Sequence, residues 1–244
     1  MFFPIRDSIP SRIFPVVNVL IIAACSMAFL YELLLGPHLE GFLQVAAFIP
    51  ARLFDTVPPE LMTFPDYGLW GNALTILISM FLHGGWMHII GNMWFLYVFG
   101  DNVEDALGHG AYLFFYLGGG FAAALLQAVM SPGSTVPNIG ASGAIAAVLG
   151  AYMVWFPHSR VQTLVFLVFF IDIWEVPALL YLAYWFLIQF LEGTMSLGVT
   201  SAGGGVAWFA HIGGFVFGFV VARLLLRTGR VRPAVPRMVV WHRM

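Results

Sequence analysis

The sequence predicts an all-α membrane protein, built as a bundle of six transmembrane helices with a long, partly membrane-embedded loop after the first helix. Two observations on composition lead to this class: 61% of the 244 residues are hydrophobic and 9% are charged. A soluble domain carries about 25% charged residues, so too few charges remain to cover a water-facing surface. The third observation is the length of the apolar stretches, because a helical span needs about 20 such residues.

Six stretches are apolar enough to be predicted as spans. They are residues 13–35, 86–104, 111–131, 142–157, 177–192 and 206–227. The connection 36–85 contains five prolines together with large apolar side chains, and we expect it to lie on or partly in the membrane surface. Its far end, residues 74–82, either extends the second helix or forms a short helix before it.

A further apolar stretch, residues 161–171, has eleven residues before Asp172 and Glu175 interrupt it. Eleven residues cannot cross the bilayer as a helix. We expect an interfacial or extended segment that leads to Pro177, with a seventh helix as the alternative.

The arginines predict the orientation of the chain. All ten basic residues are arginines, and with six spans nine of them fall on the side of the two termini, leaving Arg52 on the other. Because basic residues concentrate in cytoplasmic segments, we expect a cytoplasmic N-terminus (1–12), a transmembrane domain (13–227) and a cytoplasmic basic tail (228–244). No organelle presequence precedes the first helix, which favours a prokaryotic plasma membrane.

Composition argues against several functions. The net charge is −2, with no basic face outside the tail, so no nucleic-acid partner is expected. The single Cys25 excludes an internal disulfide and a cysteine-rich metal site, and its apolar surroundings favour a retained helix over a lipoprotein cleavage site. No His-Glu-x-x-His motif occurs and every aspartate lies near a segment end or in a loop. We therefore expect no metal, no other cofactor and no paired-aspartate protease.

Two polar residues lie inside predicted spans, where such side chains are costly and usually functional. Ser142 begins the fourth span, and His211 is near the start of the sixth. Ser142 precedes His158, and His211 precedes the cytoplasmic Arg227, by sixteen residues each, which is about 24 Å of helix. We expect the two side chains at the same depth, below the outer surface.

Small residues accompany both polar residues. They recur every four positions along the face of the fourth helix that carries Ser142, and three and seven positions after His211 on the sixth. Stripes of small residues let membrane helices approach closely, which would bring the hydroxyl within reach of the imidazole. The residues that we expect to pack these two helices together are Gly143, Ala146, Gly150, Gly214 and Gly218.

A serine hydroxyl becomes a nucleophile when an adjacent base accepts its proton, and histidine suits that role. No carboxylate lies mid-span, so the sequence indicates a dyad of Ser142 and His211. His88 and Asn92 are four residues apart on the second helix and share one face. With the Ser142 backbone N–H, they are candidate donors to an oxyanion. The alternatives are a serine that serves only helix packing, a structural histidine and an interhelical polar clamp.

Three segments resemble the motifs of rhomboid intramembrane serine proteases. They are HGGWMHIIGN at 83–92, GASGA at 140–144 and AHIGGFVFG at 210–218, in the family's order on helices two, four and six. The resemblance extends over nearly the whole chain, from residue 13 to the end of the sixth predicted span.

This resemblance implies a six-helix rhomboid fold with Ser142 as the nucleophile and His211 as the general base. It also implies that His88 and Asn92 support the oxyanion. Two departures from the family pattern are Gly71 after Trp70, where many members have arginine, and Ala146 where some place an aromatic residue. We expect another aromatic residue, such as Phe215 or Trp208, to support the imidazole ring.

The expected activity is that of a serine endopeptidase that cleaves membrane-anchored substrates in or next to their transmembrane segment. Its partners would be single-pass or other transmembrane proteins and the lipid bilayer. The alternatives are a non-catalytic rhomboid-like protein that binds transmembrane helices and a small transporter.

Overall fold

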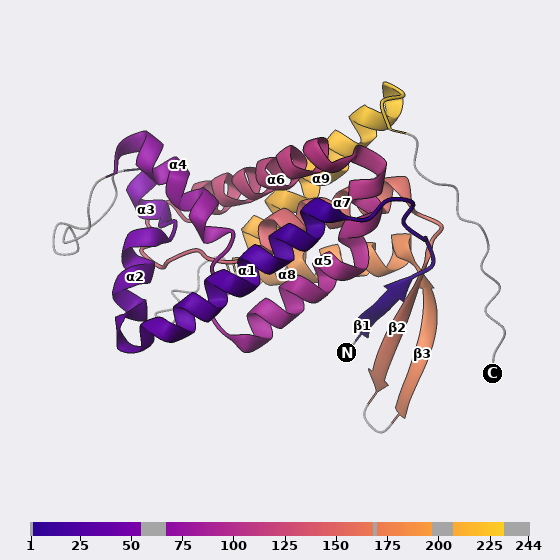
Figure 1. Ribbon diagram of the computed structural model, residues 1–244, viewed down its shortest axis with the longest axis horizontal. Helices are drawn as coiled ribbons and strands as arrows, with labels where there is room; N and C mark the ends of the chain where they lie inside the picture. The colour runs from indigo at the N-terminus through magenta and orange to yellow at the C-terminus, as the bar shows by residue number, and fades with distance from the viewer. Residues whose placement is uncertain (1, 55–66, 168–169, 197–206, 232–244) are drawn as a thin grey trace.

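A computed structural model describes residues 2–54, 67–167, 170–196 and 207–231, and it is mostly helical (Figure 1). Each stretch that the sequence predicts as a span contains a helix. The helices in chain order are α1 (Val16–Leu35), η1 (Gly36–His38), α2 (Leu39–Ala46), α3 (Pro50–Leu53), α4 (Gly68–Ser79), α5 (Trp86–Leu107), α6 (His109–Met130), α7 (Ser142–Trp155), α8 (Ala178–Ser196) and α9 (Trp208–Arg227).

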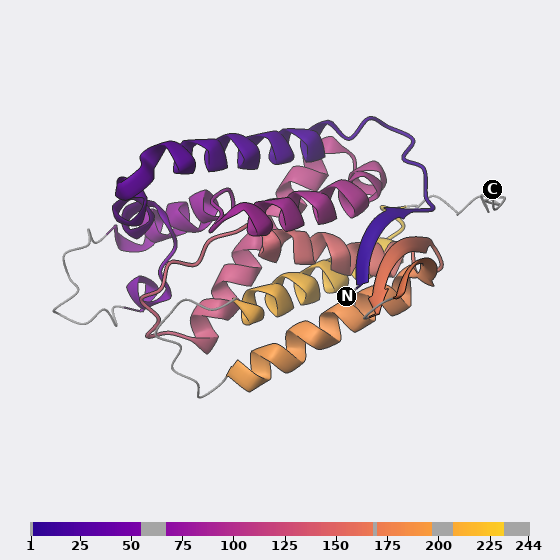
Figure 2. The same ribbon diagram turned by 90° about the horizontal axis from the view of Figure 1, so that it is seen from below.

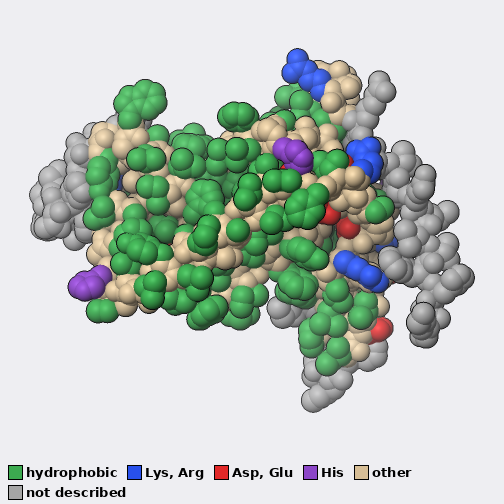
Figure 3. Space-filling view, viewed as in Figure 1, with side chains coloured by type: hydrophobic (Ala, Val, Ile, Leu, Met, Phe, Trp, Pro, Cys, Tyr) green, Lys and Arg blue, Asp and Glu red, His purple; other side chains and the backbone are tan. Residues whose placement is uncertain are grey.

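Four of the described helical segments are long and apolar enough to cross a membrane. They are Val16–Ala46, His109–Met130, Ala178–Met195 and Trp208–Arg227. Hydrophobic side chains cover the flank of the bundle, and charged side chains gather at the end near the sheet (Figure 3). The chain is therefore an integral membrane protein. The number of six spans stays a prediction, because α7 has 14 residues and α5 carries three acidic residues near its end.

Helix α7 lies at the centre of the bundle and packs against α5, α6, α8 and α9. Eleven of its residues are buried, among them Leu149 and Tyr152. A helix that is apolar all round is one that other elements surround. Its 14 residues extend for about 21 Å, so α7 is shorter than a bilayer span. Its first residue, Ser142, lines a large cleft.

Helices α7 and α9 contact each other through their backbones. A Cβ atom added at Gly214 would overlap the carbonyl oxygen of Gly143, and one added at Gly218 would overlap that of Ala147. At Gly150 an added Cβ would overlap the carbonyl oxygen of Phe215. Gly150, Gly214 and Gly218 thus lie where the two helices meet, whereas an added Cβ at Gly143 would overlap Ala123 of α6.

The connection between α1 and α5 contains η1, α2, α3 and α4. Helix α4 ends at Ser79, and turns separate it from α5 at Trp86. Of the two alternatives for residues 74–82, the structure therefore adopts the separate short helix. Residues 55–66, which include three of the prolines in the predicted partly embedded loop, lie outside the described residues.

A three-stranded antiparallel sheet corrects the all-α prediction. Strand β2 (Arg160–Leu167) lies between β1 (Phe2–Asp7) and β3 (Phe170–Pro177). The described residues of this stretch, 161–167 and 170–171, are thus extended, as one of the two alternatives predicts, and they do not form part of a seventh helix. The physical reason is its period of two: Val161, Thr163 and Val165 alternate along β2 and are fully buried. Strand β1 is not among the elements predicted from the sequence.

The start of the chain is tied to the bundle through Asp7. Its carboxyl group accepts a hydrogen bond from Asn102 of α5 at 2.9 Å and another from the Tyr152 hydroxyl of α7. Burial raises the pKa of Asp7 to about 7, because desolvation disfavours the charged form. The described chain continues past α9 to Val231, and the rest of the predicted basic tail, residues 232–244, lies outside it.

Candidate active site

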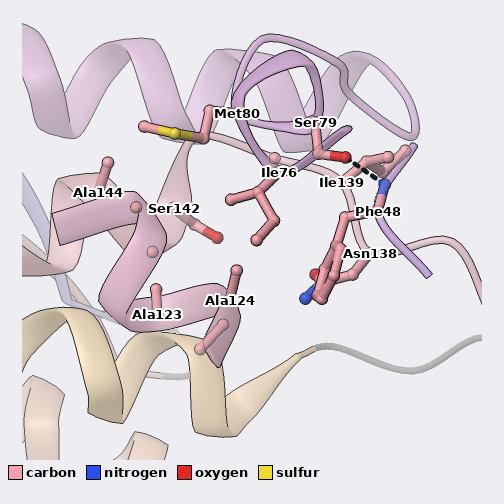
Figure 4. Close-up of a pocket in the computed structure, with 14 residues that line it drawn as sticks. Phe48, Ile76, Ser79, Met80, Ala123, Ala124, Asn138, Ile139, Ser142 and Ala144 are labelled. Atoms are coloured by element: carbon pink, nitrogen blue, oxygen red, sulfur yellow. Dashed lines mark hydrogen bonds between the residues drawn. The ribbon is translucent and has the colours of Figure 1, made fainter. Parts of the chain in front are cut away.

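Ser142 is the first residue of α7, and a network of backbone contacts holds the segment before it. The Gly140 N–H donates to the Ser79 carbonyl at 2.9 Å, and the Phe48 N–H donates to the Ser79 hydroxyl at 2.6 Å (Figure 4). Phe48 in turn pairs with Asn138 in an isolated β-bridge. Gly140 has a φ of +127°, which side-chain-bearing residues rarely adopt. Ser79 thus joins two loops in front of the serine, a role that the sequence analysis did not identify.

His211 lies in the first turn of α9 and contacts Ser142 directly. Its Nε2 atom is 2.7 Å from Ser142 Oγ, within hydrogen-bonding distance. As a whole residue, His211 is 9% exposed. Because the two residues are 69 positions apart, the contact depends on the close approach of α7 and α9.

Two tryptophans flank the imidazole. The ring of Trp208 meets it edge-on at 6.1 Å between centroids, and the ring of Trp185 on α8 is tilted against it at 5.9 Å. Phe215 packs on Trp185 and Phe186. Of the two aromatic residues proposed from the sequence, Trp208 is therefore the one that contacts the ring, and Trp185 was missed.

The second nitrogen of His211 also has a partner that the sequence analysis missed. Its Nδ1 atom is 2.5 Å from Oε1 of Gln189 on α8. The available signal was an amide side chain inside a predicted span, where polar groups are rare. A single glutamine has no spacing pattern that would point to one partner.

His88 and Asn92 project from α5 towards the same space. The Gly84 N–H donates to His88 Nδ1 at 3.2 Å, so the neutral ring carries its proton on Nε2. The Asn92 side chain is 7% exposed, and within the described residues its Nδ2 atom has no acceptor. A buried donor without an acceptor is unusual in a folded protein and is suited to a ligand that develops negative charge.

These residues share one cleft with a volume of about 1060 Å³, whose lining includes His88, Asn92, Ser142, Gln189 and His211. A small cavity of about 30 Å³ lies beside Ser142. Figure 4 shows the Ser142 hydroxyl pointing into it, opposite Phe48 and Asn138. Its side-chain lining includes Ile76, Ala123, Ala124 and Ala144.

The comparisons with known proteins agree with one another on the family that this chain resembles. The family model described as the Rhomboid domain matches residues 70–228. The chain is 31% identical to RHOMBOID-like protein 4 of Arabidopsis thaliana over 157 residues, 62% of this chain and 34% of that protein. It is 29% identical to the mitochondrial RHOMBOID-like protein 6 of the same plant over 202 residues, 78% of this chain and 59% of the relative.

A further relative is Rhomboid-like protease 5 of Toxoplasma gondii, which is 30% identical over 164 residues. The match covers 63% of this chain and 17% of that protein. The chain therefore spans less than two thirds of the length of each of these relatives.

Proposed function

This chain belongs to the rhomboid family, and on that basis we propose that it is an intramembrane serine endopeptidase. It would cleave membrane-anchored proteins in or next to their transmembrane segment, with Ser142 and His211 as a dyad. The observation that carries the proposal is the 2.7 Å separation of Ser142 Oγ and His211 Nε2 at the surface of a large cleft.

In the proposed mechanism, Ser142 Oγ attacks the carbonyl carbon of the scissile peptide while His211 Nε2 takes its proton. The resulting tetrahedral intermediate collapses, the C–N bond breaks, and the imidazolium gives the proton to the leaving amine. Water then attacks the acyl-enzyme, with His211 again accepting a proton, and releases the free carboxyl product and the serine hydroxyl.

Three donors support the oxyanion in this mechanism. The Asn92 amide has an unused N–H group in the cleft, and His88 carries a proton on the nitrogen that Gly84 does not contact. Ser142 supplies its backbone N–H, because the first residues of a helix have no intrahelical acceptor. The helix dipole of α7 adds positive potential at the same end.

The lining of the small cavity indicates which residues a substrate would have at the cleavage site. Seven of the 14 residues that line the small cavity beside Ser142 are alanine or glycine, which fits the family's preference for small residues at the cut. The substrate segment must also unwind, because a peptide carbonyl engaged in helical hydrogen bonds is hidden from the nucleophile. We propose lateral entry from the lipid, past α8 or the 132–141 loop, and access of water from the outer side.

The test compares purified wild-type protein with Ser142→Ala and His211→Ala on a model transmembrane substrate. We expect cleavage by the wild type and a loss on the order of 10⁴-fold or more in kcat in both variants, because removing either member disables the dyad. Ser26→Ala and His158→Ala are matched controls: the Ser26 hydroxyl donates to the Ile22 carbonyl of its own helix, α1, and His158 is exposed. Both controls should retain wild-type rates.

A serine-directed fluorophosphonate probe separates the protease from a non-catalytic protein that binds transmembrane helices. The protease would be labelled at Ser142, and Ser142→Ala would not. Equal cleavage by wild type and both dyad variants, or an unlabelled wild type that still binds transmembrane helices, would contradict the proposal.

A further inference from the structure

Both ring nitrogens of His211 are engaged, on opposite sides of the ring. Nε2 faces Ser142 Oγ at 2.7 Å, and Nδ1 faces Gln189 Oε1 at 2.5 Å. Gln189 is 8% exposed and His211 is 9% exposed. In this environment each polar group needs a hydrogen-bond partner, since an unpaired buried group is costly.

The chemistry of an amide oxygen determines where the ring proton lies. Gln189 Oε1 can only accept a hydrogen bond, so Nδ1 must carry the hydrogen. In neutral imidazole the lone pair is then on Nε2, the nitrogen that faces the serine hydroxyl. The opposite tautomer would present an N–H to Ser142 and could not accept its proton.

In serine proteases with a triad, a buried carboxylate holds the histidine tautomer in this way. In the part of the chain that the structure describes, no carboxylate pairs with His211. The polar partners of its ring are Ser142 and Gln189. The glutamine therefore occupies the place of the third triad member, with a neutral acceptor instead of a charged one.

We propose that Gln189 is a positioning residue that holds His211 in the tautomer and orientation needed for a general base. This inference rests on the proposed protease function. Trp185 precedes Gln189 by one helical turn on the same face of α8, and its ring contacts the imidazole. One face of α8 thus sets both the plane of the ring and the location of its proton.

Helix α8 lies at the edge of the bundle beside α9 (Figure 2). Its opposite face exposes large apolar side chains such as Leu187 and Leu191. Movement of α8 away from α9 would remove the acceptor from Nδ1. The general base is therefore assembled only while α8 is packed on α9.

The kinetic test uses Gln189→Leu, which keeps the approximate volume and removes the acceptor, and Gln189→Glu, which restores one. We expect kcat to fall by about 10- to 100-fold in Gln189→Leu with KM within twofold. This loss is smaller than the about 10⁴-fold seen when a triad aspartate becomes asparagine, because the amide is neutral. Gln189→Glu should recover most of kcat and move the ascending limb of the pH–rate profile to higher pH, because its carboxylate stabilises the imidazolium.

Leu187→Ala is the matched control, since Leu187 lies on the exposed face of the same helix; it should keep the wild-type kcat and pH profile. Across the cleft from His211, the other titratable side chain among the described lining residues is His88 of α5, and it is unchanged in every variant. A shift of the pH–rate profile in Gln189→Glu therefore reports the new carboxylate.

A second readout does not require activity. In protein labelled with ¹⁵N at the histidine rings, the His211 signals are identified by their loss in His211→Ala. We expect the proton on Nδ1 in the wild type and in Gln189→Glu, and a mixture of tautomers in Gln189→Leu. The inference is overturned if Gln189→Leu keeps the wild-type tautomer and kcat. It is also overturned if both variants lose activity together with thermal stability and the tautomer does not change.

These readouts separate this inference from the proposed function. A wild-type protein that neither cleaves substrate nor reacts with the fluorophosphonate would refute the protease assignment, while the tautomer spectra would still test the glutamine contact. A cleaving wild type with an inactive Ser142→Ala and a fully active Gln189→Leu would refute only the role of Gln189.

Discussion

At the scale of single residues, the candidate site contains several hydrogen-bonding groups, and not all of them have a partner within the protein. The hydroxyl of Ser142 and the imidazole of His211 face each other, whereas the Asn92 amide nitrogen is buried with no acceptor among the described residues. Leaving a buried donor unpaired costs about 1–3 kcal/mol. In the proposed mechanism the transition state supplies the missing acceptor, so this donor acts when charge develops.

Asn92→Ala tests this role of the amide. We expect kcat to fall by about 100-fold with little change in KM, because the removed hydrogen bond forms mainly in the transition state. Thermal stability should be equal to or slightly above that of the wild type, since a buried unpaired group is lost. Kinetics on the model substrate and a thermal unfolding scan in detergent measure both effects. An unchanged kcat would remove Asn92 from the proposed oxyanion site.

Residue identity and spacing predict Ser142, His211, His88 and Asn92 as candidate site residues, because polar residues are rare inside apolar stretches and their spacing along a helix can be counted. Gln189 is equally polar and equally placed in an apolar stretch. Its importance comes from the ring nitrogen that it contacts, and a contact across 22 positions on two different helices has no local sequence signature.

At the scale of elements, the contact between α7 and α9 is what brings Ser142 and His211 together. Glycines allow the backbones to touch, and an added methyl group at Gly214 would meet the carbonyl oxygen of Gly143. Backbone atoms cannot rotate out of the way as a side chain can, so the helices themselves would have to separate.

Gly214→Ala should therefore destabilise the protein by about 1–3 kcal/mol and weaken fluorophosphonate labelling of Ser142, because the imidazole moves away from the hydroxyl. Gly110→Ala is the matched control: Gly110 is also helical, on α6, and an added Cβ there has open space. Alanine at that position should leave labelling unchanged and raise stability slightly. Thermal unfolding and probe labelling measure both variants, and equal behaviour of the two would contradict the packing argument.

The three-stranded sheet is the part of the fold that the local sequence pattern predicts least completely. The alternation of Val161, Thr163 and Val165 is compatible with an extended segment, and the sequence analysis includes that alternative. The pairing of β1 with β2 joins residues 2–7 to residues 161–165, and nothing in the short N-terminal segment identifies its partner.

At the scale of the whole molecule, the arginine bias predicts the orientation of the bundle in the membrane. Arg223 and Arg227 belong to the C-terminal part of α9, and the start of the chain lies at the same end of the molecule as the end of α9 (Figure 1). The cleft with Ser142 opens nearer the other end of α9, at Trp208. The proposed active site would then face the outer half of the bilayer.

Accessibility of engineered cysteines tests this orientation. Cys25 is buried and is the single cysteine of the chain, so Cys25→Ala provides a background without thiols. In that background, Gly133→Cys should react with a membrane-impermeant maleimide in intact cells, and Thr228→Cys only after permeabilisation. Both positions are exposed. The reverse pattern of labelling would show the opposite orientation.

The sequence by itself determined that this is a membrane protein, which long apolar stretches contain helices, and which polar residues lie inside them. These are properties of short segments, because hydropathy and helical period depend on neighbouring residues. The tertiary structure decided that Gln189 contacts His211, that Ser79 joins the loops before Ser142, and that the N-terminal segment completes a sheet. Each of these is a contact between residues distant in the chain, and its energy exists only once the helices have packed.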